Sequence, residues 1–127
     1  MLRIYTHEDC LEHLVPEHHP ERPARLAFLI EHLERTGFTK DYPLQVAPQI
    51  GKVLMGHAHD ATLIHQLTER IPEAGLTPID PDTWISPKSL IAARYAAGAV
   101  WQGVQDVMTG EATRVFCAVR PPGHHAE

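Results

Sequence analysis

The sequence has few cysteines and no long hydrophobic run, and each shortage excludes a class of protein. Cys10 and Cys117 are the only two cysteines. They lie far apart and outside any zinc-binding spacing, so we expect reduced thiols and not a disulfide framework. The apolar stretches are too short to span a bilayer, and residues 1–10 lack the pattern of a signal peptide. The sequence therefore predicts a cytoplasmic protein without a membrane partner.

Basic residues are also scarce relative to acidic ones. Eleven lysines and arginines stand against sixteen aspartates and glutamates, which gives a formal net charge of −5. Binding to nucleic-acid phosphates needs a basic face, so we expect no nucleic-acid partner, whereas a mildly acidic protein suits a cationic substrate. The 127 residues, of which 43% are hydrophobic, suffice for one modest domain with its own core.

The pattern of apolar residues predicts an α/β fold. The expected strands are 2–6, 44–47 at an edge, and 115–119. The expected helices run from Pro23 to a stop at Gly37, once or twice within 50–71, and over 87–109, with Ser86 as cap and Pro87 as first residue. Residues 72–87 lack periodicity, which predicts a loop. The run 115–119 is typical of a strand buried on both faces of a mainly parallel sheet, and the small residues within 92–99 predict a thin helix face.

Most of the ten histidines lack the spacing of a metal site. Four fall in one predicted loop without an i, i+4 pair, which favours solvated or structural roles: His7, His13, His18 and His19. His57 and His59 form a His-x-His pair of the kind found in TIM-barrel metal hydrolases. In a helical stretch such side chains diverge, which disfavours a metal role.

Two adjacent histidines, His124 and His125, follow the predicted strand 115–119. In open α/β sheets the chemistry collects outside the carboxyl ends of the strands, where these two residues would lie. The prolines 121–122 fix the backbone, and Gly123 permits a positive φ or a close approach. Imidazoles take and give protons near neutrality, so the pair predicts general acid and base catalysis. The alternative is a plain polar loop or part of a purification tag.

The residues RPPGHHAE at 120–127 resemble the tandem-histidine signature of the zinc-dependent histone deacetylase superfamily. The resemblance is to the class II and bacterial branch, which includes histone deacetylase-like amidohydrolases and acetylpolyamine amidohydrolases. Weaker resemblance extends back to about residue 7. It implies the arginase-deacetylase α/β fold, present here in part, with a small parallel sheet of about three strands flanked by helices.

Two further segments carry the resemblance. The pattern His-Pro-Glu-x-Pro-x-Arg at 19–25 is similar to a stretch in which the arginine matching Arg25 lies near an internal channel. Without the family, Arg25 is equally a charge on a helix surface. The pattern Asp-Pro-Asp-Thr-x-x-Ser-Pro at 80–87 is similar to a rim loop in which Asp82 would accept hydrogen bonds from the substrate backbone. Thr83 and Gly123 would then be substrate contacts, although turn chemistry alone explains an aspartate at this place.

The resemblance implies hydrolysis of an acetyl-lysine or acetylpolyamine amide. His125 would serve as general base and then acid, and His124 as its electrostatic partner. In the complete family enzyme, zinc held by Asp, His and Asp activates water.

Those zinc ligands are not found in residues 1–127, which match the N-terminal part of the catalytic domain up to the tandem histidines. We therefore expect that this chain alone binds no metal and has no appreciable activity. The alternative is a non-catalytic module that binds a partner or self-associates through an open sheet edge.

Overall fold

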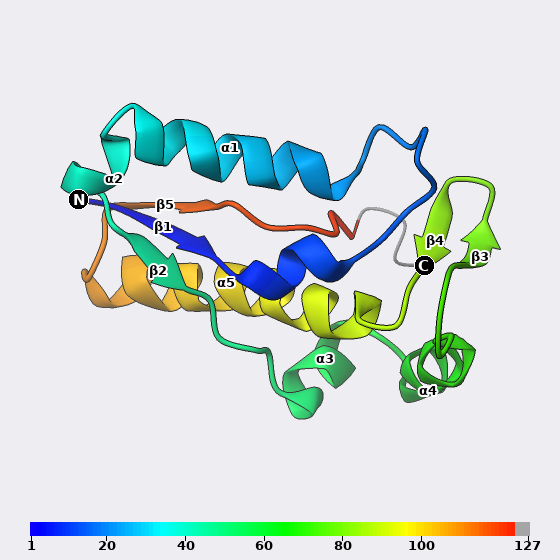
Figure 1. Cartoon of the computed structure of the whole chain (residues 1–127). Coiled ribbons are helices and arrows are strands. Elements are labelled where there is room, and N and C mark those ends of the chain that lie inside the picture. Colours follow the sequence, from blue (N-terminus) through cyan, green and yellow to red (C-terminus); the bar gives the residue numbers. More distant parts are fainter. Residues whose placement is uncertain (124–127) are drawn as a thin grey trace.

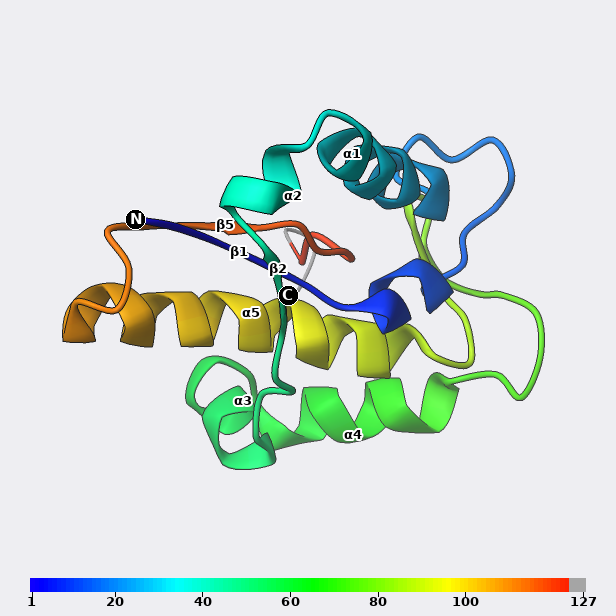
Figure 2. The same cartoon turned by 60° about the vertical axis from the view of Figure 1, so that its left-hand side comes forward.

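The structure, a computed structural model, describes residues 1–123 and is built around a three-stranded parallel sheet (Figure 1). Strand β1 (Leu2–Thr6) lies in the centre, between β2 (Leu44–Val46) and β5 (Arg114–Cys117). Ile4 is in register with Leu44 on one side and with Phe116 on the other. Figure 2 shows α1 (Pro23–Arg35) and α2 (Phe38–Asp41) on one side of the sheet and α5 (Ser89–Thr109) on the other. The predicted α/β fold, a parallel sheet of three strands flanked by helices, is confirmed.

The first long helix, α1, begins and ends where the sequence predicts. Pro23 occupies its first turn, and Gly37, with a φ of 78°, takes the left-handed conformation just after its end. Leu26 is the buried residue of this helix and packs with Ile4 and Cys10 in one core cluster. The rest of the helix is amphipathic, so burying one stripe against the sheet stabilises it more than propensity does.

The long helix α5 packs closely against the sheet because small residues line its inner face. Ala92 and Ala99 are completely buried. A Cβ atom added to Gly98 would overlap the backbone carbonyl of Pro48, and one added to Gly103 would lie 2.8 Å from a methyl group of Val115. These contacts confirm the predicted thin face, and they leave no space for larger side chains.

Two boundaries around α5 differ from the prediction. The helix begins at Ser89, after Lys88 and not after Ser86. The Ser86 hydroxyl does not cap α5 because it is used elsewhere: it accepts a hydrogen bond from Leu14 N and lies 3.2 Å from the carbonyl oxygen of Glu12. The predicted loop 72–87 is also wrong, since it contains the antiparallel strands β3 (Thr77–Asp80) and β4 (Thr83–Ile85). A register shift between Pro78 and Asp80 explains why no alternating pattern is visible in the sequence.

The remaining elements connect these layers. A short 3₁₀ helix, η1 (Glu8–Glu12), lies in the predicted histidine-rich loop. The apolar region 50–71 forms two helices, α3 (Lys52–Ala58) and α4 (Ala61–Arg70), and the Asp60 side chain caps α4 by accepting from Thr62 N. None of the helices formed by residues 1–123 is long and apolar enough to cross a membrane.

Strand β5 is an edge strand of the described sheet, because it pairs with β1 alone. The prediction that it is buried on both faces is therefore wrong for these residues: Phe116 is 46% exposed, and Val115 and Cys117 are half-buried. The chain becomes buried only past the strand, at Ala118 and Arg120. In Figure 1 the strands run toward the side on which the β3–β4 hairpin lies.

Candidate functional site

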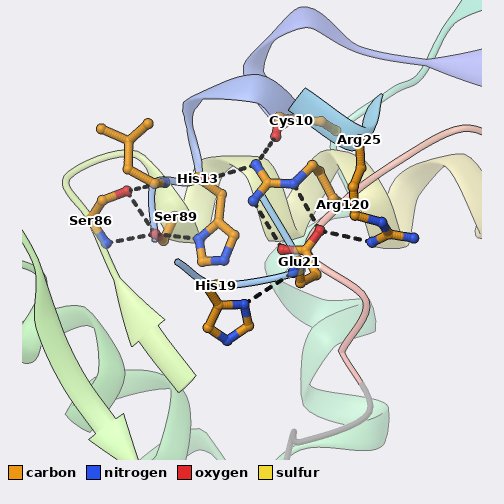
Figure 3. A network of polar contacts seen from close by, with 9 residues as sticks. Cys10, His13, His19, Glu21, Arg25, Ser86, Ser89 and Arg120 are labelled. Atoms are coloured by element: carbon orange, nitrogen blue, oxygen red, sulfur yellow. Dashed lines mark hydrogen bonds and ion pairs between the residues drawn. The ribbon is translucent and has the colours of Figure 1, made fainter. Parts of the chain in front are cut away.

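Arg120 lies just past the end of β5 and is only 2% exposed. Its Nε and Nη2 atoms each donate to one carboxylate oxygen of Glu21 at 2.9 Å, and Nη1 donates to the carbonyl oxygens of Cys10 at 2.8 Å and His13 at 2.6 Å (Figure 3). A buried guanidinium requires such partners, because an unpaired buried charge is very costly. The residue thus joins the strand exit to the end of η1 and to the segment before α1.

Glu21 is held in the charged form by this contact. Burial disfavours its carboxylate, but the hydrogen bonds and positive charge of Arg120 outweigh burial and lower the pKa of Glu21 below its ordinary value. Arg25, in the first turn of α1, lies 3.3 Å from the same carboxylate, although its own side chain is 62% exposed. The Glu21 carboxylate is therefore paired with two arginines, the buried Arg120 and the exposed Arg25.

His13 is buried beside Arg120 and is held in the neutral form. Burial, followed by the positive charge of Arg120, lowers the pKa of His13 to about 4. Its Nδ1 atom lies 2.7 Å from the hydroxyl of Ser89, which also accepts from the backbone N–H of Ser86 at 2.7 Å. These contacts attach the η1 segment to the start of α5, and they form the left part of the network in Figure 3.

The β3–β4 turn is joined to this network through His19. The Nε2 atom of His19 lies 2.8 Å from the backbone carbonyl oxygen of Asp82, and its Nδ1 atom accepts from the backbone N–H of Glu21 at 3.1 Å. The amide N–H of Asp82 donates to the Asp80 carboxylate at 2.8 Å, as in an ordinary Asx turn. Segments 19–21, 80–83 and 120–123 are therefore neighbours at one end of the sheet.

The predicted site residues lie in different parts of the structure. Asp82 is exposed at the turn, and the hydroxyl oxygen of Thr83 is buried without a hydrogen-bond partner in the part of the chain that the structure describes. Gly123 is exposed with a φ of 73°, so of the two alternatives given for it, a close approach or a positive φ, the structure shows the second. Arg25 lies on the surface of α1, and its predicted place at an internal channel stays a prediction. His124 and His125 lie outside the described residues.

Residues 1–123 do not fit a zinc site. No three histidine, cysteine, aspartate or glutamate side chains within that range are close enough together to hold a metal ion. His57 lies in the last turn of α3 and His59 directly follows the helix, so this pair belongs to a helix end. Tetrahedral zinc needs three or four converging ligands.

The sequence did not predict Arg120, Glu21, His13, Ser86 or Ser89 as site residues. A signal for Arg120 was present, because it directly follows five apolar residues and an arginine in that position needs a buried counter-charge. Nothing in the sequence identifies Glu21 as that partner from 99 residues away. Ser86 was interpreted only as a helix-capping residue.

The chain is an α/β domain with a parallel sheet. Its polar cluster lies outside the carboxyl ends of the strands, which is where domains of this class place their binding and catalytic sites. Comparison with known proteins identifies the family. The family model of the histone deacetylase domain matches residues 19–127. The chain therefore belongs to the histone deacetylase domain family.

Individual relatives agree with this assignment. A protein named type-2 histone deacetylase 1 from Dictyostelium discoideum is 28% identical over 170 residues, covering 94% of this chain and 11% of that protein. A probable deacetylase from Archaeoglobus fulgidus is 31% identical, covering 98% of this chain and 34% of that protein. The crystal structure of the HDA15 HD domain matches with a TM-score of 0.87 and 29% identity, covering 98% of this chain and 36% of that one. The chain thus spans well under half the length of these proteins.

Proposed function

We propose that this chain supplies the proton-transfer and substrate-rim part of a zinc-dependent deacetylase that hydrolyses acetyl-lysine or acetylpolyamine amides. One observation carries the proposal: the segments that match the family's motifs, 19–25, 80–87 and 120–123, meet in one cluster at the carboxyl end of the sheet. Segments so distant in sequence are expected to converge where a site needs them together. We further propose that residues 1–127 correspond to the first part of the catalytic domain.

In this proposal each residue has a separate task. His125 accepts and then returns a proton, and His124 orients it and balances its charge. The Asp82 carboxylate accepts hydrogen bonds from the substrate backbone, and Thr83 and Gly123 line the same region. Arg25 belongs to a channel that is completed by other parts of the domain. Zinc would polarise the amide carbonyl and activate water, and its ligands would come from the parts of a deacetylase domain that this chain does not cover.

The branch of the family and the cell compartment also belong to the proposal. The RPPGHHAE residues and the relative named type-2 histone deacetylase support the class II and bacterial branch. Whether the substrate is an acetyl-lysine or an acetylpolyamine would depend on pocket residues in the parts of a deacetylase domain that this chain does not cover. A cytoplasmic location stays a prediction.

The proposal is tested by a chimera in which this chain replaces the matching segment of the Archaeoglobus fulgidus relative. We expect the chimera to hydrolyse an acetyl-lysine peptide in the presence of zinc, and we expect Asp82→Asn to raise KM for that peptide. The chain alone should give no turnover with added zinc. Turnover by the chain alone that is abolished by His125→Ala, or a folded chimera with no zinc-dependent turnover, would contradict the proposal.

An exposed apolar face favours a second candidate, a non-catalytic module that self-associates. The face is formed by one side of α5 and by the neighbouring edge strand: its exposed members on the helix are Val100, Val104, Val107 and Met108, and the half-buried Val115 and Cys117 adjoin them from β5. A groove of about 320 Å³ lies between the two elements. Exposed apolar surface next to an unpaired strand edge is typical of an interface.

A further inference from the structure

His19 makes two hydrogen bonds to backbone groups that lie far apart in sequence. Nδ1 is 3.1 Å from the amide nitrogen of Glu21, and Nε2 is 2.8 Å from the carbonyl oxygen of Asp82, 63 residues away. Its ring is half-buried between the two segments, and Figure 3 shows it beside Glu21. Among the described residues, no other hydrogen bond joins the Asp82 carbonyl to the segment before α1.

The two partners determine where the proton of His19 lies. An amide N–H can only donate, so Nδ1 must carry a lone pair, and a carbonyl oxygen can only accept, so Nε2 must carry the proton. One neutral tautomer therefore satisfies both bonds, and the other satisfies neither. This chemical requirement follows from the backbone partners and needs no observed hydrogen position.

The Glu21 end of this link is itself held in place. The Glu21 carboxylate receives two hydrogen bonds from the buried Arg120 side chain, which lies at the exit of β5 just before the turn at Gly123. Arg120, Glu21, His19 and Asp82 thus form one continuous series of contacts from the strand exit to the β3–β4 turn. The last contact uses the Asp82 carbonyl and leaves its exposed carboxylate available.

We propose that His19 is a positioning residue that fixes the Asp82 turn relative to the exit of β5. In terms of the proposed function, on which this role rests, it holds the substrate-binding aspartate at a constant distance from the turn that leads to His124 and His125. His19 itself touches no reacting atom. The link is specific for imidazole, because the ring reaches both backbone groups at once.

The first test uses the unaltered 127-residue chain with ¹⁵N-labelled histidine. Long-range ¹⁵N–¹H correlation spectra distinguish the two neutral tautomers of each ring. We expect a single His19 form protonated at Nε2. Protonation at Nδ1, or averaged shifts that report both tautomers in exchange, would overturn the proposal without any variant being needed.

The second test compares two variants of the same chain. In His19→Asn, the side-chain oxygen can still accept from Glu21 N–H as an Asx turn does, but it is too short to reach Asp82. We expect its Thr83 amide resonance to shift, because that amide shares a peptide group with the Asp82 carbonyl whose hydrogen bond is lost. An unchanged Thr83 resonance would overturn the link.

The matched control is Asp82→Asn, which changes the side chain and keeps the carbonyl. It should leave the His19 tautomer unaltered, and loss of the Nε2–H form in this variant would contradict a link through the carbonyl. Neither readout depends on catalysis. A folded chimera without turnover would therefore contradict the proposed function but not the His19–Asp82 hydrogen bond. A His19 ring protonated at Nδ1 would contradict that hydrogen bond but not the proposed function.

Discussion

Arg120 and Glu21, 99 residues apart, face each other through two parallel hydrogen bonds of 2.9 Å each at the exit of β5. The arginine side chain is 3% exposed and the glutamate side chain 15%. A bidentate pair with so little solvent around it fixes geometry as well as charge. It holds the segment before α1 against the residues that lead to Gly123, and the other contacts of the candidate site are arranged around it.

Arg120→Met should destabilise the chain by about 3–5 kcal/mol, because the substitution leaves the Glu21 carboxylate partly buried without its partner and removes the donor to the carbonyls of Cys10 and His13. Urea unfolding followed by circular dichroism measures the change. The matched control is Arg25→Met, which removes the exposed partner of the same carboxylate and should cost less than about 1 kcal/mol. Equal effects of the two substitutions would contradict this account of the pair.

The stability of the fold should fall as the pH is lowered from about 6.5 to about 4. Burial and Arg120 lower the pKa of His13 in the folded chain from 6.5 to about 4, so in this window the unfolded chain binds a proton that the folded chain does not. The stabilisation is complete above about 6.5 and is lost as the pH approaches 4, by up to roughly 3 kcal/mol.

The pH effect is assigned to His13 with one substitution. In His13→Asn, an amide oxygen replaces Nδ1 as a partner for Ser89, and the residue no longer titrates. The difference between urea midpoints at pH 7 and pH 5 should shrink in this variant. An undiminished difference would mean that other groups cause the pH dependence.

Gly98→Ala should destabilise the chain by about 1–3 kcal/mol, because the new methyl group would overlap the Pro48 carbonyl and push α5 away from the segment that follows β2. Gly56 in α3 offers the contrasting substitution, since a Cβ there meets nothing within 4 Å. Gly56→Ala should stabilise the chain by about 0.5–1 kcal/mol, the usual gain for alanine in a helix. Thermal unfolding of both variants measures these effects, and a tolerated Gly98→Ala would refute the close contact.

The exposed face of α5 predicts association that depends on concentration, if the second candidate function is correct. Val104→Glu places a charge in this face and should reduce the apparent mass in light scattering toward that of a monomer. Val53→Glu is the control, because Val53 is equally apolar and 78% exposed but lies on α3. A chain that is monomeric at all concentrations would exclude self-association through this face.

The sequence predicted the layers of the fold well, and it predicted the contacts of the site only in part. The helix α1 and the strands β1 and β2 follow from local patterns, since Pro23, Gly37 and the apolar spacing act within a few residues of each other. The β3–β4 hairpin was missed because it is short and irregular, and because Pro78 within β3 and Pro81 in the turn both favour a loop.

The exposure of β5 could not be predicted from its apolar residues. The apolar run indicates a buried strand, but whether a strand is central or at an edge depends on which neighbours pair with it. The partners of Arg120 depend on the tertiary structure for the same reason. The sequence predicts a solvated or structural role for His19 and includes it in the stretch 19–25, but nothing in the sequence places it beside Asp82.

The most direct test of the central claim is the steady-state rate of acetyl-lysine hydrolysis by the chimera with and without His125→Ala. General acid and base catalysis by His125 predicts a fall in kcat of about 10²–10⁴-fold at constant zinc content, whereas His18→Ala, an exposed histidine before α1, should leave kcat nearly unchanged. A folded His125→Ala chimera that retains the parent rate would contradict the claim that this chain provides the proton-transfer residues of a deacetylase.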